Sequence, residues 1–161
     1  MTVKEYNRSV KDFGDPVYRF IYRSIKDRDR ASDIVQDTYE KLWRNVTEVE
    51  FVVVKSWLFT AAYNRMIDVI RKDSRLIPVE TYDDSALFAE ENQADLNELL
   101  HKALQKLPAD QRSVILLRDY EGYSYKEISD ITGQTEAQVK IHIFRGRVAM
   151  RNMLEKTSVW S

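Results

Sequence analysis

The apolar residues of the first half recur every three or four positions, which is the spacing of an amphipathic helix. The first helix is predicted to begin at Asp15-Pro16, because Asp can cap free amides and Pro suits a first helical position. Two more helices are predicted over about 29–45 and 56–72, separated by a β-branched segment, 47–54, that reads as an extended loop. The residues predicted to face the core of this half are Val17, Phe20, Ile21, Ile25, Ile34, Val35, Tyr39, Leu42, Trp57, Leu58, Ala61, Ala62, Val69 and Ile70.

An acidic stretch interrupts the helical pattern in the middle of the chain. No Lys or Arg occurs between Leu76 and Asn97, while Glu and Asp recur along it. A loop of this length inside one compact domain would be unusual. The chain is therefore predicted to form two domains, 1–75 and 95–161, joined by a linker, 76–94, that carries at most a helical turn at 86–91.

The second half is also predicted to be helical. A helix over about 96–106 ends at Leu107-Pro108, and the next helix buries the apolar run 115–117 before a turn at Glu121-Gly122. Because the chain has only four Gly and three Pro, and its polar residues are mostly good helix formers, the fold class is all-α.

Two capping signals mark the last two helices. Ser124 and Glu127 have the spacing of a capping box, as have Thr135 and Gln138. Gly133 lies between them and suits a tight turn. Two helices joined in this way are the sequence form of a helix-turn-helix, and the second runs to about Leu154 and ends in a basic cluster.

Composition excludes several function classes. The chain has no cysteine, so disulfides and thiolate metal sites are ruled out. Neither His101 nor His142 has a ligand at metal spacing, and no Gly-rich phosphate loop is present, so we expect no metal, no cofactor and no enzyme activity. No secretory signal or membrane span is visible, so an intracellular, cytoplasmic protein is expected.

Charge constrains how the chain could bind nucleic acid. Its 25 basic and 26 acidic residues give a net charge of −1, which disfavours tight, independent DNA binding. The charge is uneven, because the segment 140–151 contains basic residues and no acid. Local fields therefore matter more than the sum.

The last helix carries the residues that could read DNA. Ile128, Ile131, Val139 and Ile143 would form the small core of the helix-turn-helix. The residues left outside are Gln138, Lys140, Ile141, His142, Phe144 and Arg145, with Arg147 and Arg151 placed to reach phosphates. Positions 138, 141, 142 and 145 share one face, where Gln and Arg can hydrogen-bond base edges and Ile can touch a thymine methyl. A helical hairpin with a solvated basic face is the alternative.

The motifs of both halves resemble one family. The run Asp33-Ile34-Val35-Gln36-Asp37 through Trp43 resembles the polymerase-clamp-binding helix of sigma factors. The segment from Trp57-Leu58 through Asn64 to Arg71-Lys72 resembles their helix that engages the minus-ten promoter element. Leu107-Pro108, Arg112, the run 123–128 and the run 139–147 resemble their domain that reads the minus-thirty-five element. The order and length are similar to the extracytoplasmic-function sigma factors, the small two-domain members of the bacterial sigma-70 family.

This resemblance implies a transcription initiation factor with three contact surfaces. It implies that the partners are core RNA polymerase, promoter DNA and an anti-sigma factor, often a membrane protein, with no small-molecule substrate. The polymerase surface would comprise Asp33, Ile34, Gln36, Asp37, Glu40 and Trp43. The minus-ten surface would comprise Asn64, Arg65, Asp68, Arg71 and Lys72. The minus-thirty-five surface would comprise Gln138, Lys140, Ile141, His142, Phe144, Arg145 and Arg147.

Two alternatives stay open on the residues alone. A dimeric helix-turn-helix regulator would need the last helix but not the Asp33–Trp43 motif or Asn64. A helical adaptor with no DNA role would need neither. The promoter preference also stays open, because Ile141-His142 stands where many relatives have Ser-Arg and the segment 48–54 departs from the common pattern.

Overall fold

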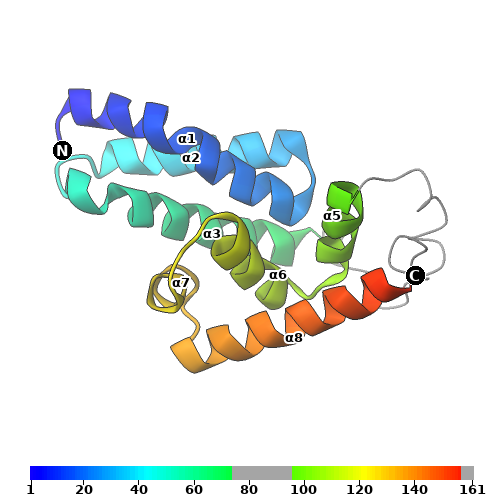
Figure 1. The fold of residues 1–161 in the computed structure, drawn as a ribbon. Coiled ribbons are helices and arrows are strands. Elements are labelled where there is room, and N and C mark those ends of the chain that lie inside the picture. Colours follow the sequence, from blue (N-terminus) through cyan, green and yellow to red (C-terminus); the bar gives the residue numbers. More distant parts are fainter. Residues whose placement is uncertain (74–95, 157–161) are drawn as a thin grey trace.

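A computed structural model describes residues 1–73 and 96–156 of the chain (Figure 1). Its elements are α1 (Val3–Ile25), α2 (Arg28–Arg44), the short 3₁₀ helix η1 (Phe51–Val53), α3 (Val54–Lys72), α5 (Leu96–Lys106), α6 (Ala109–Ile115), the π-helical turn η3 (Leu116–Tyr120), α7 (Tyr125–Thr132) and α8 (Glu136–Glu155). The all-α prediction is confirmed for this part of the chain. The helical turn predicted at 86–91 lies outside the described residues.

The first helix begins far earlier than the sequence pattern predicted. Thr2 and Glu5 form a capping box at its start, with the Thr2 hydroxyl accepting from the Glu5 amide at 3.1 Å. The prediction of a start at Asp15 was wrong, because Pro16 lies inside α1. An internal proline removes one backbone hydrogen bond. The helix continues across it with Ser9 buried before Pro16 and Val17 buried after it.

Helices α1, α2 and α3 pack as one bundle around the predicted core. Phe20, Leu42 and Leu58 are among its fully buried side chains. The extended loop predicted over 47–54 is wrong: Val49 is buried in a turn, and η1 leads directly into α3. Val49 and Val54 are buried in the core at the two ends of this segment, whereas Val52 is 83 % exposed. Burial of the two ends therefore holds the segment in a turn.

The second domain contains the predicted helix-turn-helix. Both capping boxes are present, at Ser124–Glu127 before α7 and at Thr135–Gln138 before α8. Gly133 adopts a φ of 78° between the two helices, a conformation that favours glycine. The predicted core residues Ile128, Ile131, Val139 and Ile143 are all buried.

The two domains pack against each other in the described structure. Helix α7 lies beside the first part of α3, and α5 lies beside the end of α1 (Figure 1). The Phe59 and Tyr123 rings meet edge to face at 5.1 Å, so the buried residues of the two domains form one continuous cluster. No helix in residues 1–73 or 96–156 is long and apolar enough to cross a membrane.

Candidate polymerase and nucleic-acid interfaces

Helix α2 presents one acidic and aromatic face to solvent. Asp27 caps its start by accepting from the Arg30 amide at 3.1 Å, which fixes the rotation of the helix. Most residues of the predicted polymerase surface then lie exposed or half-exposed on one side, namely Asp33, Gln36, Asp37, Glu40 and Trp43. Ile34 is separate from them, because it is only 2 % exposed and packs in the core beneath this face.

Trp43 is held at the end of this face by neighbouring aromatic rings. It is 49 % exposed, and its ring meets the Tyr6 ring edge to face at 5.1 Å. Tyr6 in turn meets the ring of Tyr39, whose hydroxyl donates to the Ser9 carbonyl at 2.8 Å. Burial raises the pKa of Tyr39 above its ordinary value. Trp43 therefore forms a supported, partly exposed aromatic surface of the kind that dominates protein interfaces.

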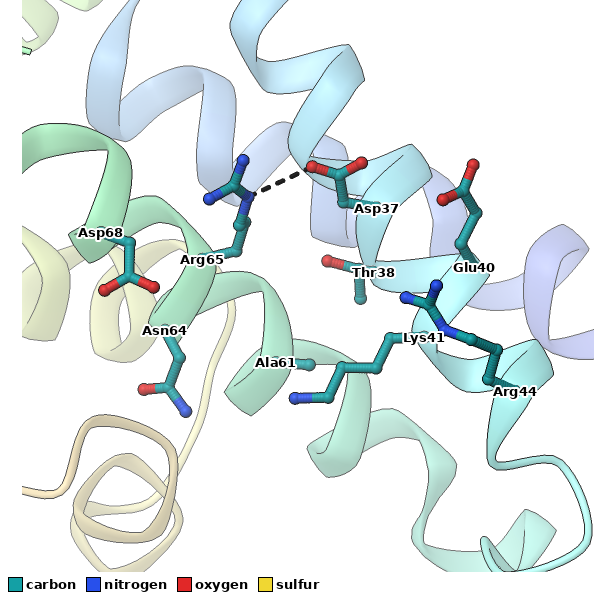
Figure 2. Close-up of a pocket in the computed structure, with 9 residues that line it drawn as sticks. All are labelled: Asp37, Thr38, Glu40, Lys41, Arg44, Ala61, Asn64, Arg65 and Asp68. Carbon is teal, nitrogen blue, oxygen red and sulfur yellow. Dashed lines mark hydrogen bonds and ion pairs between the residues drawn. The ribbon is translucent and has the colours of Figure 1, made fainter. Parts of the chain in front are cut away.

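Helix α3 lies next to α2 and exposes the predicted minus-ten residues. Asn64, Arg65, Asp68, Arg71 and Lys72 are all exposed. A cavity of about 320 Å³ lies between the two helices. Asn64 and Asp68 of α3 and Lys41 and Arg44 of α2 are among the residues that line it, as Figure 2 shows. This cavity brings together residues of the predicted polymerase surface and of the predicted minus-ten surface.

An ion pair joins these two surfaces across the cavity. The Arg65 guanidinium donates from Nε to Asp37 Oδ2 at 3.1 Å, as Figure 2 shows. Both side chains are about half exposed, at 45 % for Arg65 and 47 % for Asp37. The two residues were predicted to lie on different surfaces, and their contact has no signal in the sequence spacing.

Asn64 also borders a second cavity, of about 480 Å³, where the two domains meet. The α3 side contributes Trp57, Thr60 and Asn64, and α7 contributes the carboxylates of Glu127 and Asp130. Glu127 is the capping-box acid of α7. Hydrogen bonding of its carboxylate to Ser124, chiefly to the backbone amide at 3.0 Å, lowers its pKa. Asn64 therefore shares this cavity with two carboxylates of the second domain.

Helix α8 exposes most of the predicted minus-thirty-five residues. Phe144 is 69 % exposed and Ile141 is 47 % exposed, which is unusual for large apolar side chains. Gln138, Lys140 and Arg145 are exposed beside them. Arg and Gln donors interleaved with apolar side chains suit the edges of base pairs in a major groove.

Three of the predicted DNA-reading side chains have hydrogen-bonding partners among the described residues. Gln138 accepts from the Thr135 amide at 2.8 Å as part of the capping box. His142 is half-buried, and its Nδ1 lies 2.7 Å from Oε1 of Gln134. Arg147 lies against Asp119 with its Nε 3.2 Å from Oδ2. The structure therefore leaves Lys140, Ile141, Phe144 and Arg145 as the exposed centre of this surface.

Polar contacts that the sequence pattern did not predict join the domains. Arg19 of α1 binds both carboxylate oxygens of Glu121, at 3.0 and 2.8 Å, and Arg23 approaches the same carboxylate at 3.5 Å. The Glu121 side chain is only 4 % exposed. Gln105 also donates to the Arg23 carbonyl at 2.6 Å. Glu121 and Arg19 are 102 positions apart, and no local signal in the sequence pairs them.

Comparison with known families accounts for both domains. The sequence matches the family Sigma-70 region 2 over residues 10–76 and the family Sigma-70, region 4 over residues 97–150. The first match contains the α2 and α3 faces, and the second contains the helix-turn-helix.

Individual relatives match over nearly their whole length. The RNA polymerase sigma factor SigV of Bacillus subtilis is 31 % identical over 150 residues, covering 91 % of this chain and 89 % of that protein. The ECF RNA polymerase sigma factor SigM of the same bacterium is 28 % identical and covers 97 % of both chains. Among solved structures, the sigma factor RpoE of Bartonella quintana, in complex with the anti-sigma factor NepR, superposes with a TM-score of 0.75 at 26 % identity. That match covers 96 % of this chain and 99 % of the solved one.

Proposed function

The chain belongs to the extracytoplasmic-function sigma factors of the sigma-70 family, and from this premise we propose which side chains carry out its function. As a sigma factor it binds core RNA polymerase and directs promoter recognition and transcription initiation. The proposal assigns the polymerase contact to α2, the minus-ten contact to α3 and the minus-thirty-five contact to α8. The observation that carries it is the exposed, adjacent placement of the α2 and α3 residues around one cavity.

The polymerase contact rests on the exposed face of α2. Asp33, Gln36, Asp37 and Glu40 offer acceptors to a basic partner surface, and the half-exposed Trp43 offers a large apolar area. Ile34 supports this face from the core and does not contact the partner.

The minus-ten contact rests on Asn64 and the basic residues beside it. The Asn64 amide both donates and accepts, so it can read the edge of an unstacked base. Unstacking a base costs a few kcal/mol, which contacts from Arg65, Arg71 and Lys72 to the strand would offset. Asp68 lies on the same exposed face and completes the polar lining of the cavity.

The minus-thirty-five contact rests on α8 in the major groove. Arg145 and Gln138 supply hydrogen bonds to base edges, Ile141 and Phe144 supply apolar contact, and Lys140 and Arg147 reach the backbone. His142 contributes at the edge of this surface, where Gln134 orients its ring.

The remaining proposals concern the setting in which the protein acts. It acts as a non-catalytic factor in the cytoplasm, since RNA polymerase and promoter DNA are found there. An anti-sigma factor is its proposed inhibitor, because a solved relative, RpoE, was determined in complex with the anti-sigma factor NepR. The division into domains 1–75 and 95–161 with the acidic linker 76–94 is proposed as the means by which the two reading domains reach separated promoter elements.

The test is reconstitution with core bacterial RNA polymerase, followed by mapping of start sites on genomic DNA. Stable binding and discrete start sites are expected for the natural chain. Trp43→Ala should weaken polymerase binding, Asn64→Ala should reduce open-complex formation, and Arg145→Ala should reduce recognition by about 1–3 kcal/mol. The matched controls Asn7→Ala and Arg28→Ala change the same residue types as Asn64 and Arg145, and Tyr18→Ala changes another aromatic residue. All three lie on other surfaces and should leave initiation unchanged. Equal effects of the proposed and control changes would refute the residue assignment.

A further inference from the structure

The ion pair between Asp37 and Arg65 joins two surfaces that have different proposed partners. Asp37 lies on the polymerase face of α2, and Arg65 lies on the DNA face of α3. Their contact of 3.1 Å spans the cavity drawn in Figure 2. Any partner that takes one of these side chains therefore changes the state of the other.

The Asp37 carboxylate binds an Arg65 donor of the kind that also binds phosphate. A guanidinium binds carboxylates and phosphates through the same N–H donors and in the same planar geometry. While Nε donates to Asp37, that donor is not available to a DNA backbone oxygen. The carboxylate also places negative charge beside the path that we propose for the minus-ten strand.

Access and strength both favour exchange of this pair. Each side chain is close to half exposed, so a polymerase side chain or a phosphate can reach it without unfolding the domain. Exposed ion pairs of this kind are weak because water screens them. A basic polymerase group could therefore displace Arg65 from Asp37 with little cost.

We propose that binding of polymerase to Asp37 releases Arg65 to contact the DNA backbone, so that one ion-pair exchange links the two binding events. This inference rests on the proposed function of the α2 and α3 faces. In the free chain, Asp37 is a positioning residue that withholds Arg65 from DNA. In the holoenzyme, the same carboxylate belongs to the polymerase interface and Arg65 neutralises a phosphate.

The proposal predicts opposite effects of one substitution on two partners. Asp37→Ala should weaken binding to core polymerase, because a carboxylate contact is lost. It should also strengthen binding of the free chain to single-stranded DNA by about two- to fivefold, the range expected for an exposed ion pair. The dependence of that binding on salt should steepen by about one released counterion.

Asp33 provides a matched control on the same helix face. It lies one helical turn before Asp37 and is exposed, and within residues 1–73 Arg65 pairs with Asp37 rather than with Asp33. Asp33→Ala changes the net charge by the same amount as Asp37→Ala. Asp33→Ala should weaken polymerase binding. Its DNA affinity should lack the gain of about two- to fivefold expected for Asp37→Ala, because the ion pair with Arg65 stays intact.

The experiment measures fluorescence anisotropy with a labelled mixed-sequence single-stranded oligonucleotide, and polymerase affinity in parallel. The variants are Asp37→Ala, Asp33→Ala, Arg65→Ala and the double change Asp37→Ala with Arg65→Ala, each checked for its helical circular dichroism. The expected result is a gain in DNA affinity for Asp37→Ala that disappears in the Arg65→Ala background. Equal DNA affinity of the Asp37→Ala and Asp33→Ala chains, with polymerase binding weakened in both, would overturn the exchange. Unchanged polymerase binding in both single variants would instead overturn the proposed polymerase face.

Discussion

Glu121 is a buried polar residue that joins the two domains. Its side chain is 4 % exposed and accepts two hydrogen bonds from Arg19. It also forms a longer ion pair, of 3.5 Å, with Arg23. Replacing Glu121 by Ala removes all three contacts and leaves both arginines able to turn toward water. The change should therefore weaken the contact between the domains without disturbing the core of either one.

The magnitude follows from the number and exposure of these hydrogen bonds. A hydrogen bond to a charged group contributes about 1.5–3 kcal/mol net. Arg19 is 44 % exposed, so water screens its bonds, and we count its bidentate contact as one such bond. Glu121→Ala should then shift the equilibrium between packed and separated domains by about 10- to 150-fold.

The absence of cysteine makes this shift measurable. Arg28→Cys and Arg151→Cys place two unique labels on exposed positions, one in each domain. The distance between the labels is followed as urea is added below the unfolding transition, because separation exposes the buried face between the domains. The midpoint of separation should move to lower urea in Glu121→Ala.

Two controls make the result specific to the interdomain pair. Asp12→Ala removes the exposed pair with Arg8 within α1, at 3.4 Å, and should leave the midpoint unchanged. The exchange of Arg19→Glu with Glu121→Arg should restore part of the loss that each single change causes. A midpoint in Glu121→Ala equal to that of the natural chain would refute the reasoning, since the contacts would then contribute nothing to packing.

Two further predictions concern the stability of the second domain. Tyr123→Phe should raise the free energy of unfolding by up to about 1 kcal/mol at neutral pH, because the buried Tyr123 hydroxyl has no hydrogen-bond partner among the described residues. Burial raises the pKa of Tyr123 above its ordinary value of 10.0. The natural chain should therefore lose stability as the pH rises through and above that value, and Tyr123→Phe should lose less. Urea unfolding at neutral and alkaline pH tests the gain at neutral pH and the difference in pH dependence. Gly146→Ala should destabilise the domain by about 1–3 kcal/mol, because its Cβ would clash with Cδ1 of the buried Ile115. Adding Ile115→Val removes that atom and should recover most of the loss, which a double-mutant cycle of thermal unfolding would show; additive effects would contradict the steric cause.

The sequence was a reliable guide to the helices and to their exposed faces. The capping boxes at Ser124 and Thr135 and the core around Ile128 and Val139 are where spacing predicted them, because these features depend on residues within one or two turns. The start of α1 was mispredicted because Pro16 is typical of a first turn. Whether a proline lies inside a helix depends on the packing of the residues on both sides.

Partners across the fold could not be predicted from spacing. Periodicity shows which face of a helix a residue occupies, but not which other helix that face meets. Arg65 was predicted to contact phosphate, and the structure adds that Asp37, 28 positions earlier, already binds it. Gln138 was assigned both to the capping box and to the DNA surface, and the structure shows the hydrogen bond of the capping role.

Ion pairs within the chain add a local effect to the near-neutral net charge in limiting DNA affinity. Arg65 and Arg147, one in each reading domain, are both held by carboxylates of the chain, Asp37 and Asp119. A domain whose DNA-facing arginines are already paired gains less from phosphate contact than its count of basic residues suggests, because each new contact replaces an existing one. The net charge therefore does not show how strongly DNA affinity depends on which groups bind the carboxylates of Asp37 and Asp119. If polymerase occupies Asp37, the affinity of the minus-ten surface rises where it is needed, and the free chain avoids binding to unrelated DNA.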